Sequence, residues 1–167
     1  MKVSLQEAVG KNYADFWNTK RRYRVCKGSR GSKKSKTTAL NMIYRLMEYP
    51  LANGLCVRRY SNTLRDSVFS DLKWAIHKLG LDAFFECTVS PMQIVRKSTG
   101  QKILFRGLDD GLKITSISVD YGVLCFVWIK KWFTLNLFNC WNTLTYRRGQ
   151  SAAKLFDKNF LFSVIYL

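Results

Sequence analysis

Eight residues near the N-terminus have the types and the spacing of a loop that holds phosphate groups. They read Gly28-Ser29-Arg30-Gly31-Ser32-Lys33-Lys34-Ser35, close to the pattern G-x-x-x-x-G-K-[ST]. In such a Walker A loop, backbone N–H groups and the start of the next helix attract phosphate oxygens. A lysine then reaches the β- and γ-phosphates, and a hydroxyl binds Mg²⁺. The sequence therefore predicts binding of ATP and Mg²⁺, with Lys34 on the phosphates and Ser35 on the metal.

One position departs from the pattern, because Lys33 stands where a second glycine is expected. If the loop needs a positive φ there, a residue with a side chain costs roughly 1–2 kcal/mol. The flanking residues favour the loop, since 21–26 alternates like a strand and 35–48 has one apolar helical face. The alternative is a flexible basic loop that caps an ordinary helix and whose lysines are simply solvated.

Composition indicates one globular domain with an anionic partner. The chain has 167 residues, is 47% hydrophobic and carries a formal net charge of +17. Such a charge favours nucleic acid, nucleotides or acidic membrane surfaces, and the alternative is a solvated basic surface. No apolar run reaches the roughly 18–20 residues of a membrane span. The single histidine, His77, excludes a His-based metal site, and five scattered cysteines indicate a reducing cytoplasm.

Strand and helix patterns alternate along the chain, which predicts an α/β fold with a mostly parallel sheet flanked by helices. The run 122–129 is the most apolar and predicts a central parallel strand. A turn at 98–101 predicts a hairpin. The other expected strands are 21–26, 55–59, 85–89, 92–97 and 103–106, and the expected helices are 5–19, 35–48, 63–79 and a turn at 112–117.

These motifs together resemble the large subunits of tailed-phage terminases, in the type found in Bacillus prophages. The resemblance covers about residues 10 to 129 and rests on the loop, the strand 55–59, the stretch 62–69, the stretch 103–110 and the apolar strand. Loops of this type commonly read G-S-R-G-S-K-K-S, so Lys33 is similar to the subfamily's own variant. The resemblance implies a P-loop NTPase-like ATPase domain that drives DNA into a capsid, followed by a nuclease domain.

The resemblance also implies roles and partners. Lys34 matches the phosphate-binding lysine, Ser35 the magnesium-binding hydroxyl, and Arg30 the arginine that stabilises charge on the transferred phosphate. Trp17 or Tyr23 could stack on adenine, although core packing is the more ordinary role for either. The implied partners are double-stranded phage DNA, the terminase small subunit and the portal, in the cytoplasm of a bacterial host and without a membrane.

The chain departs from the family where the second nucleotide motif belongs. In the family the apolar strand ends in W-I-E-E, whereas here Trp128-Ile129 is followed by Lys130-Lys131. Two cations thus replace the carboxylates that hold Mg²⁺, and like charges repel in a partly dry site. None of the three nearby aspartates, Asp109, Asp110 and Asp120, ends that strand.

A shift of reading frame would explain the change, because the glutamate codons GAA GAA read one base late encode Lys-Lys. Residues 130–167 hold one acidic and six basic residues, and their aromatic residues lack a clear period. We therefore expect a partial terminase ATPase domain at 1–129 and a divergent, out-of-frame tail at 130–167, with a fold that is incomplete at the C-terminus. The alternative is a genuine divergent element. The apolar run 160–167 has no obvious partner and is a β-aggregation hazard if exposed.

Two functions follow from these expectations. The first is a truncated N-terminal fragment of a terminase large subunit that binds nucleotide through the P-loop and has little or no ATP turnover alone. The second is a non-enzymatic, basic prophage remnant that binds DNA or interferes with packaging. For the second function phosphate contacts could come from arginines and lysines that would otherwise form a solvated face, namely Arg58, Arg59, Arg65, Lys97 and Arg106.

Overall fold

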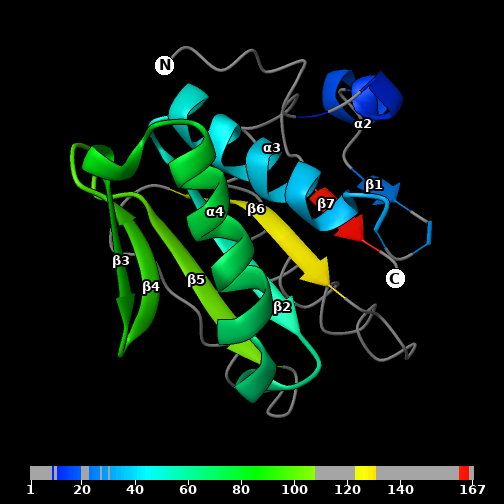
Figure 1. The fold of residues 1–167 in the computed structure, drawn as a ribbon. Coiled ribbons are helices and arrows are strands. Elements are labelled where there is room, and N and C mark those ends of the chain that lie inside the picture. The colour runs from blue at the N-terminus through cyan, green and yellow to red at the C-terminus, as the bar shows by residue number, and fades with distance from the viewer. Residues whose placement is uncertain are drawn as a thin grey trace, which may run out of the picture.

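The computed structural model describes residues 9, 11–19, 23–26, 28–29, 31–107, 123–130 and 162–165. In this part of the chain, seven strands form one sheet in the order β1-β7-β6-β2-β5-β4-β3 (Figure 1). The strands are β1 (Tyr23–Cys26), β2 (Ala52–Arg58), β3 (Phe85–Val89), β4 (Met92–Arg96), β5 (Lys102–Gly107), β6 (Val123–Lys130) and β7 (Phe162–Ile165). The α-helices are α2 (Ala14–Asn18), α3 (Lys34–Glu48) and α4 (Ser70–Lys78).

The sheet is mostly parallel, as the sequence predicts. Strands β1, β7, β6, β2 and β5 all pair in parallel, while β4 and β3 form an antiparallel extension. The turn expected at 98–101 joins β4 to β5, and Gly100 within it has a φ of 70°. Strand β6 is central, between β7 and β2. Parallel pairing brings the carboxyl ends of β1, β6 and β2 to one edge of the sheet.

The C-terminal apolar segment has partners, so our expectation that it lacks them is wrong. Strand β7 pairs with β1 on one side and with β6 on the other. Its backbone N–H and C=O groups are therefore used in two ladders, which removes the exposed edge that would promote aggregation. A strand that follows β6 in sequence thus belongs to the sheet. The helical turn expected at 112–117 lies outside the described residues.

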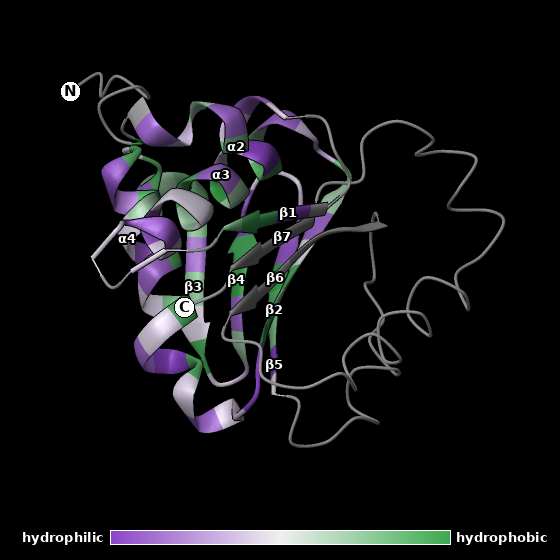
Figure 2. Ribbon diagram, turned by 90° about the vertical axis from the view of Figure 1, so that its right-hand side faces the viewer, coloured by the Kyte–Doolittle hydropathy of each residue, from purple (hydrophilic) through white to green (hydrophobic). Residues whose placement is uncertain are grey.

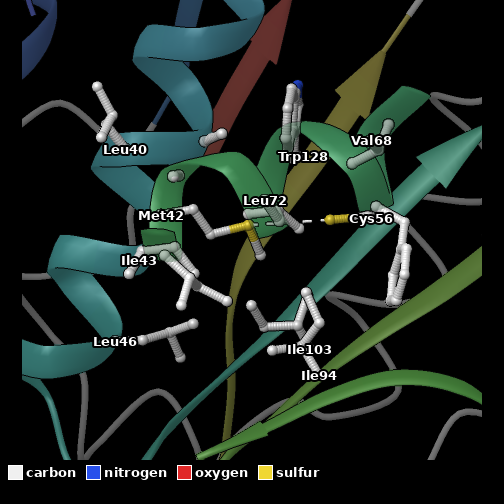
Figure 3. Close-up of a cluster of buried hydrophobic side chains, with 14 of the residues drawn as sticks. Leu40, Met42, Ile43, Leu46, Cys56, Val68, Leu72, Ile94, Ile103 and Trp128 are labelled. Carbon is white, nitrogen blue, oxygen red and sulfur yellow. Dashed lines mark hydrogen bonds between the residues drawn. The ribbon is translucent and has the colours of Figure 1, made fainter. Parts of the chain in front are cut away.

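Helices α3 and α4 lie side by side on the same face of the sheet (Figures 1 and 2). The apolar face expected on α3 is confirmed, because Leu40, Ile43 and Leu46 are at most 1% exposed. These side chains meet the inward faces of α4 and of the strands in one core (Figure 3). Trp128, from the central strand β6, is also buried in this core.

The segment 61–79 is less regular than one helix. A 3₁₀ turn at Ser61–Thr63 and a π-helical turn at Arg65–Phe69 precede α4. The hydroxyl of Thr63, the first residue of the expected helix, donates to the carbonyl of Tyr60, 2.8 Å away, and does not cap α4. The expected end is confirmed, since Gly80 has a φ of 68° and its N–H bonds to His77 O.

Glycine at position 54 lets α3 approach the sheet closely. A Cβ built on Gly54 would collide with the terminal methyl group of Met42, which projects from α3 onto β2. The Met42 sulfur also lies 3.9 Å from the Sγ of buried Cys56 (Figure 3). Added volume at this contact would strain a packed interface rather than fill a gap.

We predict that Gly54→Ala lowers the free energy of unfolding by about 0.5–1.5 kcal/mol, because the flexible end of Met42 must leave its preferred rotamer to make room. Met42→Leu removes the colliding methyl group and alone costs less than about 1.5 kcal/mol. Urea unfolding of both single variants and the double variant should show that the double variant loses less than the two single losses added together. Strictly additive losses would contradict this contact.

Candidate functional site

The loop between β1 and α3 has the backbone that the sequence pattern suggests. Gly31 has a φ of 81° and Lys33 a φ of 60°, both in the left-handed region. The cost expected at Lys33 is therefore present, because a side chain at positive φ is unfavourable by roughly 1–2 kcal/mol. Helix α3 begins at Lys34, directly after this residue. The loop thus turns sharply, and Lys34 lies at the N-terminus of α3.

Lys34 is the centre of the loop. Its side chain is 3% exposed, and its Nζ donates to Gly28 O at 2.7 Å, to Ser29 O at 2.6 Å and to Ser32 Oγ at 2.7 Å. Among the described residues no carboxylate forms an ion pair with it. The buried ammonium is therefore satisfied by neutral oxygens only, and an anionic oxygen would be a stronger acceptor.

The geometry fits a phosphate group at this loop. At Gly28 a Cβ would lie 3.3 Å from Ser32 Oγ, which is a tight contact, and 3.6 Å from Lys34 Nζ, so glycine leaves more room beside the ammonium than a residue with a side chain would. Ser35 lies in the first turn of α3 and is half-buried. The described residues thus offer an ammonium for phosphate oxygens and a hydroxyl for Mg²⁺. Arg30, the expected catalytic residue, lies outside the described residues.

Two of the three lysines at the end of the loop and the start of α3, Lys34 and Lys36, are not simply solvated. Lys36 forms a 3.0 Å ion pair with Asp71, and its Nζ lies 4.4 Å from the ring centre of Trp74. This pair joins α3 to α4 beside the loop. Lys33 alone of the three is exposed, because Lys34 is buried and Lys36 is half-buried.

The end of β6 is level with the end of the strand that enters the loop. Ile165 of β7 pairs with Cys26 on one side and with Lys130 on the other. One intervening strand puts the two backbones about 10 Å apart. The position where the family's second motif is expected therefore lies beside the loop, and it carries Lys130. The structure does not describe Lys131 or the three aspartates Asp109, Asp110 and Asp120. Within the part of the chain that it does describe, no group of three or more His, Cys, Asp or Glu side chains could hold a metal ion.

A buried arginine on β1 is a feature that the sequence pattern missed. Arg24 is 3% exposed while its neighbour Val25 is 61% exposed, so the charged residue faces α3. Its Nη1 donates to Phe16 O at 3.0 Å and to Asn41 Oδ1 at 3.3 Å. Burial, and then the charge of Arg45, lower the pKa of Arg24 to about 10. Alternating residue types in a short strand indicate that it has two different faces, but they do not indicate which face is covered by helices.

Helix α2 is attached to this part of the site. Arg24 holds Phe16 O, and Arg45 Nη2 donates to Trp17 O at 3.2 Å. The Trp17 ring lies 5.5 Å from that of Tyr44, so Trp17 takes part in the packing of α2 against α3. Nothing in the sequence signalled these helix contacts. For Tyr23, the other candidate for adenine, the structure describes the backbone only.

Further up the same segment, Tyr13 contacts the loop itself. Its hydroxyl donates a hydrogen bond to the carbonyl oxygen of Ser32.

The thiol of Cys26 lies just before the loop. Burial raises its pKa, although the nearby positive charges of Lys34 and Arg24 act in the opposite direction. This burial disfavours the thiolate form of Cys26.

The five basic residues proposed for phosphate contact differ in how far they are exposed. Arg58 is half-buried, and its Nη1 donates to Thr63 O and Ser67 Oγ, both at 2.7 Å, so it braces the turn before α4. Burial lowers the pKa of Arg58. Arg106 is half-buried, whereas the exposed members are Arg59, Arg65 and Lys97.

Among the described residues, we find no helix with both the length and the apolar character that a membrane span requires.

Comparison with known sequences gives a family. The family model described as phage terminase large subunit matches residues 20–148, which extends past the boundary expected at 130. The terminase large subunit of Bacillus phage SPP1 is 34% identical over 134 residues, which are 78% of this chain and 32% of that protein. The PBSX phage terminase large subunit of Bacillus subtilis (strain 168) is 29% identical over 124 residues, 74% of this chain and 27% of that one. The chain spans about a third of the length of these relatives.

Solved structures have the same fold. The N-terminal domain of the DNA packaging ATPase from bacteriophage phi29 aligns with a TM-score of 0.63 at 16% identity, over 93% of this chain and 77% of that one. The large terminase of a thermophilic bacteriophage, solved in complex with ADP, aligns with a TM-score of 0.58 at 14% identity, over 87% of this chain and 33% of that one. The sheet with its helices is thus the P-loop NTPase-like fold of these domains. From the match over residues 20–148, this chain belongs to the phage terminase large subunit family.

Proposed function

We propose that this chain binds ATP through residues 28–35 as the nucleotide-binding part of a DNA-packaging motor. The observation that carries the proposal is the buried Lys34 ammonium, held by three loop oxygens at the start of α3. In the bound state Lys34 exchanges neutral acceptors for phosphate oxygens, and the Ser35 hydroxyl is the ligand offered to Mg²⁺. The metal, when bound, neutralises charge on the phosphates. Arg30 is the proposed residue for stabilising charge that develops on the transferred phosphate.

Turnover by this chain alone is proposed to be little or none. Hydrolysis in P-loop NTPases needs a carboxylate near the phosphates to hold the metal and a group that positions water. Position 130, level with Cys26 at the mouth of the loop, supplies a lysine instead. A cation there attracts phosphate but cannot accept a proton from water or bind Mg²⁺. Binding is therefore separated from catalysis in this proposal.

The partners are those of intact members of the family, and we propose them by that resemblance. They are double-stranded phage DNA as the cargo, with the small subunit and the portal, in the cytoplasm of the bacterial host. A second candidate is a non-enzymatic remnant that binds DNA or interferes with packaging. The net charge of +17 and three exposed basic side chains favour it: Arg59, Arg65 and Lys97. Its signature is DNA affinity that falls steeply with salt in a protein without nucleotide affinity.

Nucleotide titration separates the two functions. We predict that ATP binds the full chain and that Lys34→Ala weakens this binding by about tenfold or more, since a charge-assisted hydrogen bond contributes roughly 1.5–3 kcal/mol. Lys97→Ala, the matched control, removes an exposed ammonium outside residues 28–35 and should retain affinity within a few-fold. Calorimetric titration measures both. Equal losses in the two variants would contradict a specific role of Lys34.

The same loop predicts an effect on stability. Lys33→Gly relieves the positive φ, although the added freedom of the unfolded chain offsets about 0.4–1 kcal/mol of the gain. We predict a free energy of unfolding that is equal to or up to about 1 kcal/mol above that of the wild type. Lys33→Val places a β-branched residue at the same φ and should be less stable than both. Thermal unfolding checks the order Gly, Lys, Val, and a reversed order would rule out the left-handed conformation.

We also propose that residues 130–167 arise from a change of reading frame after a partial ATPase domain at 1–129. The support is the Lys-Lys pair where the family has acidic residues, together with the loss of acidic residues beyond it. The family match that continues to residue 148 and the pairing of β7 weigh on the other side. A genuine divergent element remains the alternative.

The nucleotide sequence of the locus decides between these alternatives. We predict that restoring one base before codon 130 yields acidic residues at positions 130 and 131, with further terminase sequence downstream. Sequencing this region checks the prediction directly. If no frame restores a carboxylate at these positions, the divergent element is correct.

A further inference from the structure

Tyr13 is the residue through which the N-terminal segment touches the phosphate loop. It is half-buried just before α2, and its hydroxyl donates to Ser32 O. Ser32 also takes part in the contacts of the central lysine, because its Oγ accepts from Lys34 Nζ at 2.7 Å and donates to Ser29 O at 2.9 Å. Tyr13 is thus one residue removed from the ammonium of Lys34.

The other end of α2 is fixed to the body of the domain. Arg24 and Arg45 donate to Phe16 O and Trp17 O at 3.0 and 3.2 Å. These are carbonyls of the last turn of α2, where cationic groups are favourable. Arg24 comes from β1 and Arg45 from α3, the two elements that the loop connects. Tyr13 therefore precedes a helix that is hydrogen-bonded to both elements flanking the loop.

The Tyr13 contact fixes the orientation of one peptide group. A trans peptide directs its C=O and its N–H to opposite sides. Because Ser32 C=O points to Tyr13, the N–H of Lys33 points away from Tyr13. Lys33 is the residue at positive φ, where the family pattern allows more freedom through glycine. A loop without that glycine benefits from an outside contact that holds the peptide.

We propose that Tyr13 is a positioning residue for nucleotide binding, which holds the Ser32–Lys33 peptide from outside the loop and so presets the loop for phosphate. This inference rests on the proposed nucleotide function and adds a residue 15 positions before the loop's first glycine. The hydroxyl acts on the loop backbone and does not touch the phosphate. The tyrosine ring remains in place when only the oxygen is removed.

The test compares Tyr13→Phe with Tyr44→Phe in the full chain. Tyr44 is the matched control, because its ring packs on Trp17 at the same α2–α3 contact, away from the loop. Two quantities are measured: the affinity for ADP by calorimetry, and the rate of amide hydrogen exchange at residues 32–34 without nucleotide. Thermal unfolding of both variants reports any general loss of structure.

We expect Tyr13→Phe to weaken ADP binding roughly threefold to tenfold, as loss of one hydrogen bond implies, and to speed exchange at residues 32–34. Tyr44→Phe should change neither quantity. Unchanged ADP affinity or unchanged loop exchange in Tyr13→Phe, or equal effects in the two variants, overturns the positioning role. If wild-type protein fails to bind ADP, the proposed function fails, and unchanged loop exchange would then overturn the Tyr13 contact separately.

Discussion

The organisation of the phosphate loop depends on one buried ammonium group. Lys34 lies at the start of α3 with 3% of its surface exposed and with three neutral oxygens around its Nζ. A charge in such a position is costly unless its hydrogen bonds are satisfied, and the loop must fold so that its own oxygens provide them. The positive φ of Gly31 and Lys33 and the missing Cβ of Gly28 all serve this arrangement. The loop is thus shaped around a cation that favours an anionic ligand.

The surrounding helices and strands fix the position of the loop that holds Lys34. Helix α3 packs its apolar face against the sheet through Leu40, Ile43 and Leu46, and Gly54 allows the close approach of Met42. On the other side of the loop, α2 is tied by Arg24 and Arg45, and Tyr13 reaches Ser32. The positions of the loop's two ends therefore follow from core packing, whereas its internal geometry follows from polar contacts.

The parts of this arrangement that local sequence encodes could be predicted. The 3.6-residue period of α3 and the spacing of the glycines and Lys34 were sufficient for the helix, the loop and the strain at Lys33. Contacts between distant segments could not be predicted in the same way. The burial of Arg24 depends on α2 and α3, which contact it, and the place of β7 depends on its pairing with β1 and β6. Short apolar runs carry no signal of which neighbours they pair with.

The register of the strands β1, β7 and β6 also determines which charged residue lies beside the phosphate loop. Cys26, Ile165 and Lys130 share one level, so the end of β6 lies beside the loop and carries a basic residue. A crystal structure of the full chain with ADP is the sharpest test of the role of Lys34. We expect β-phosphate oxygens within hydrogen-bond distance of Lys34 Nζ, with β7 between β1 and β6. A nucleotide bound elsewhere, or a Lys34 Nζ still held by Gly28, Ser29 and Ser32 with ADP present, would contradict this role.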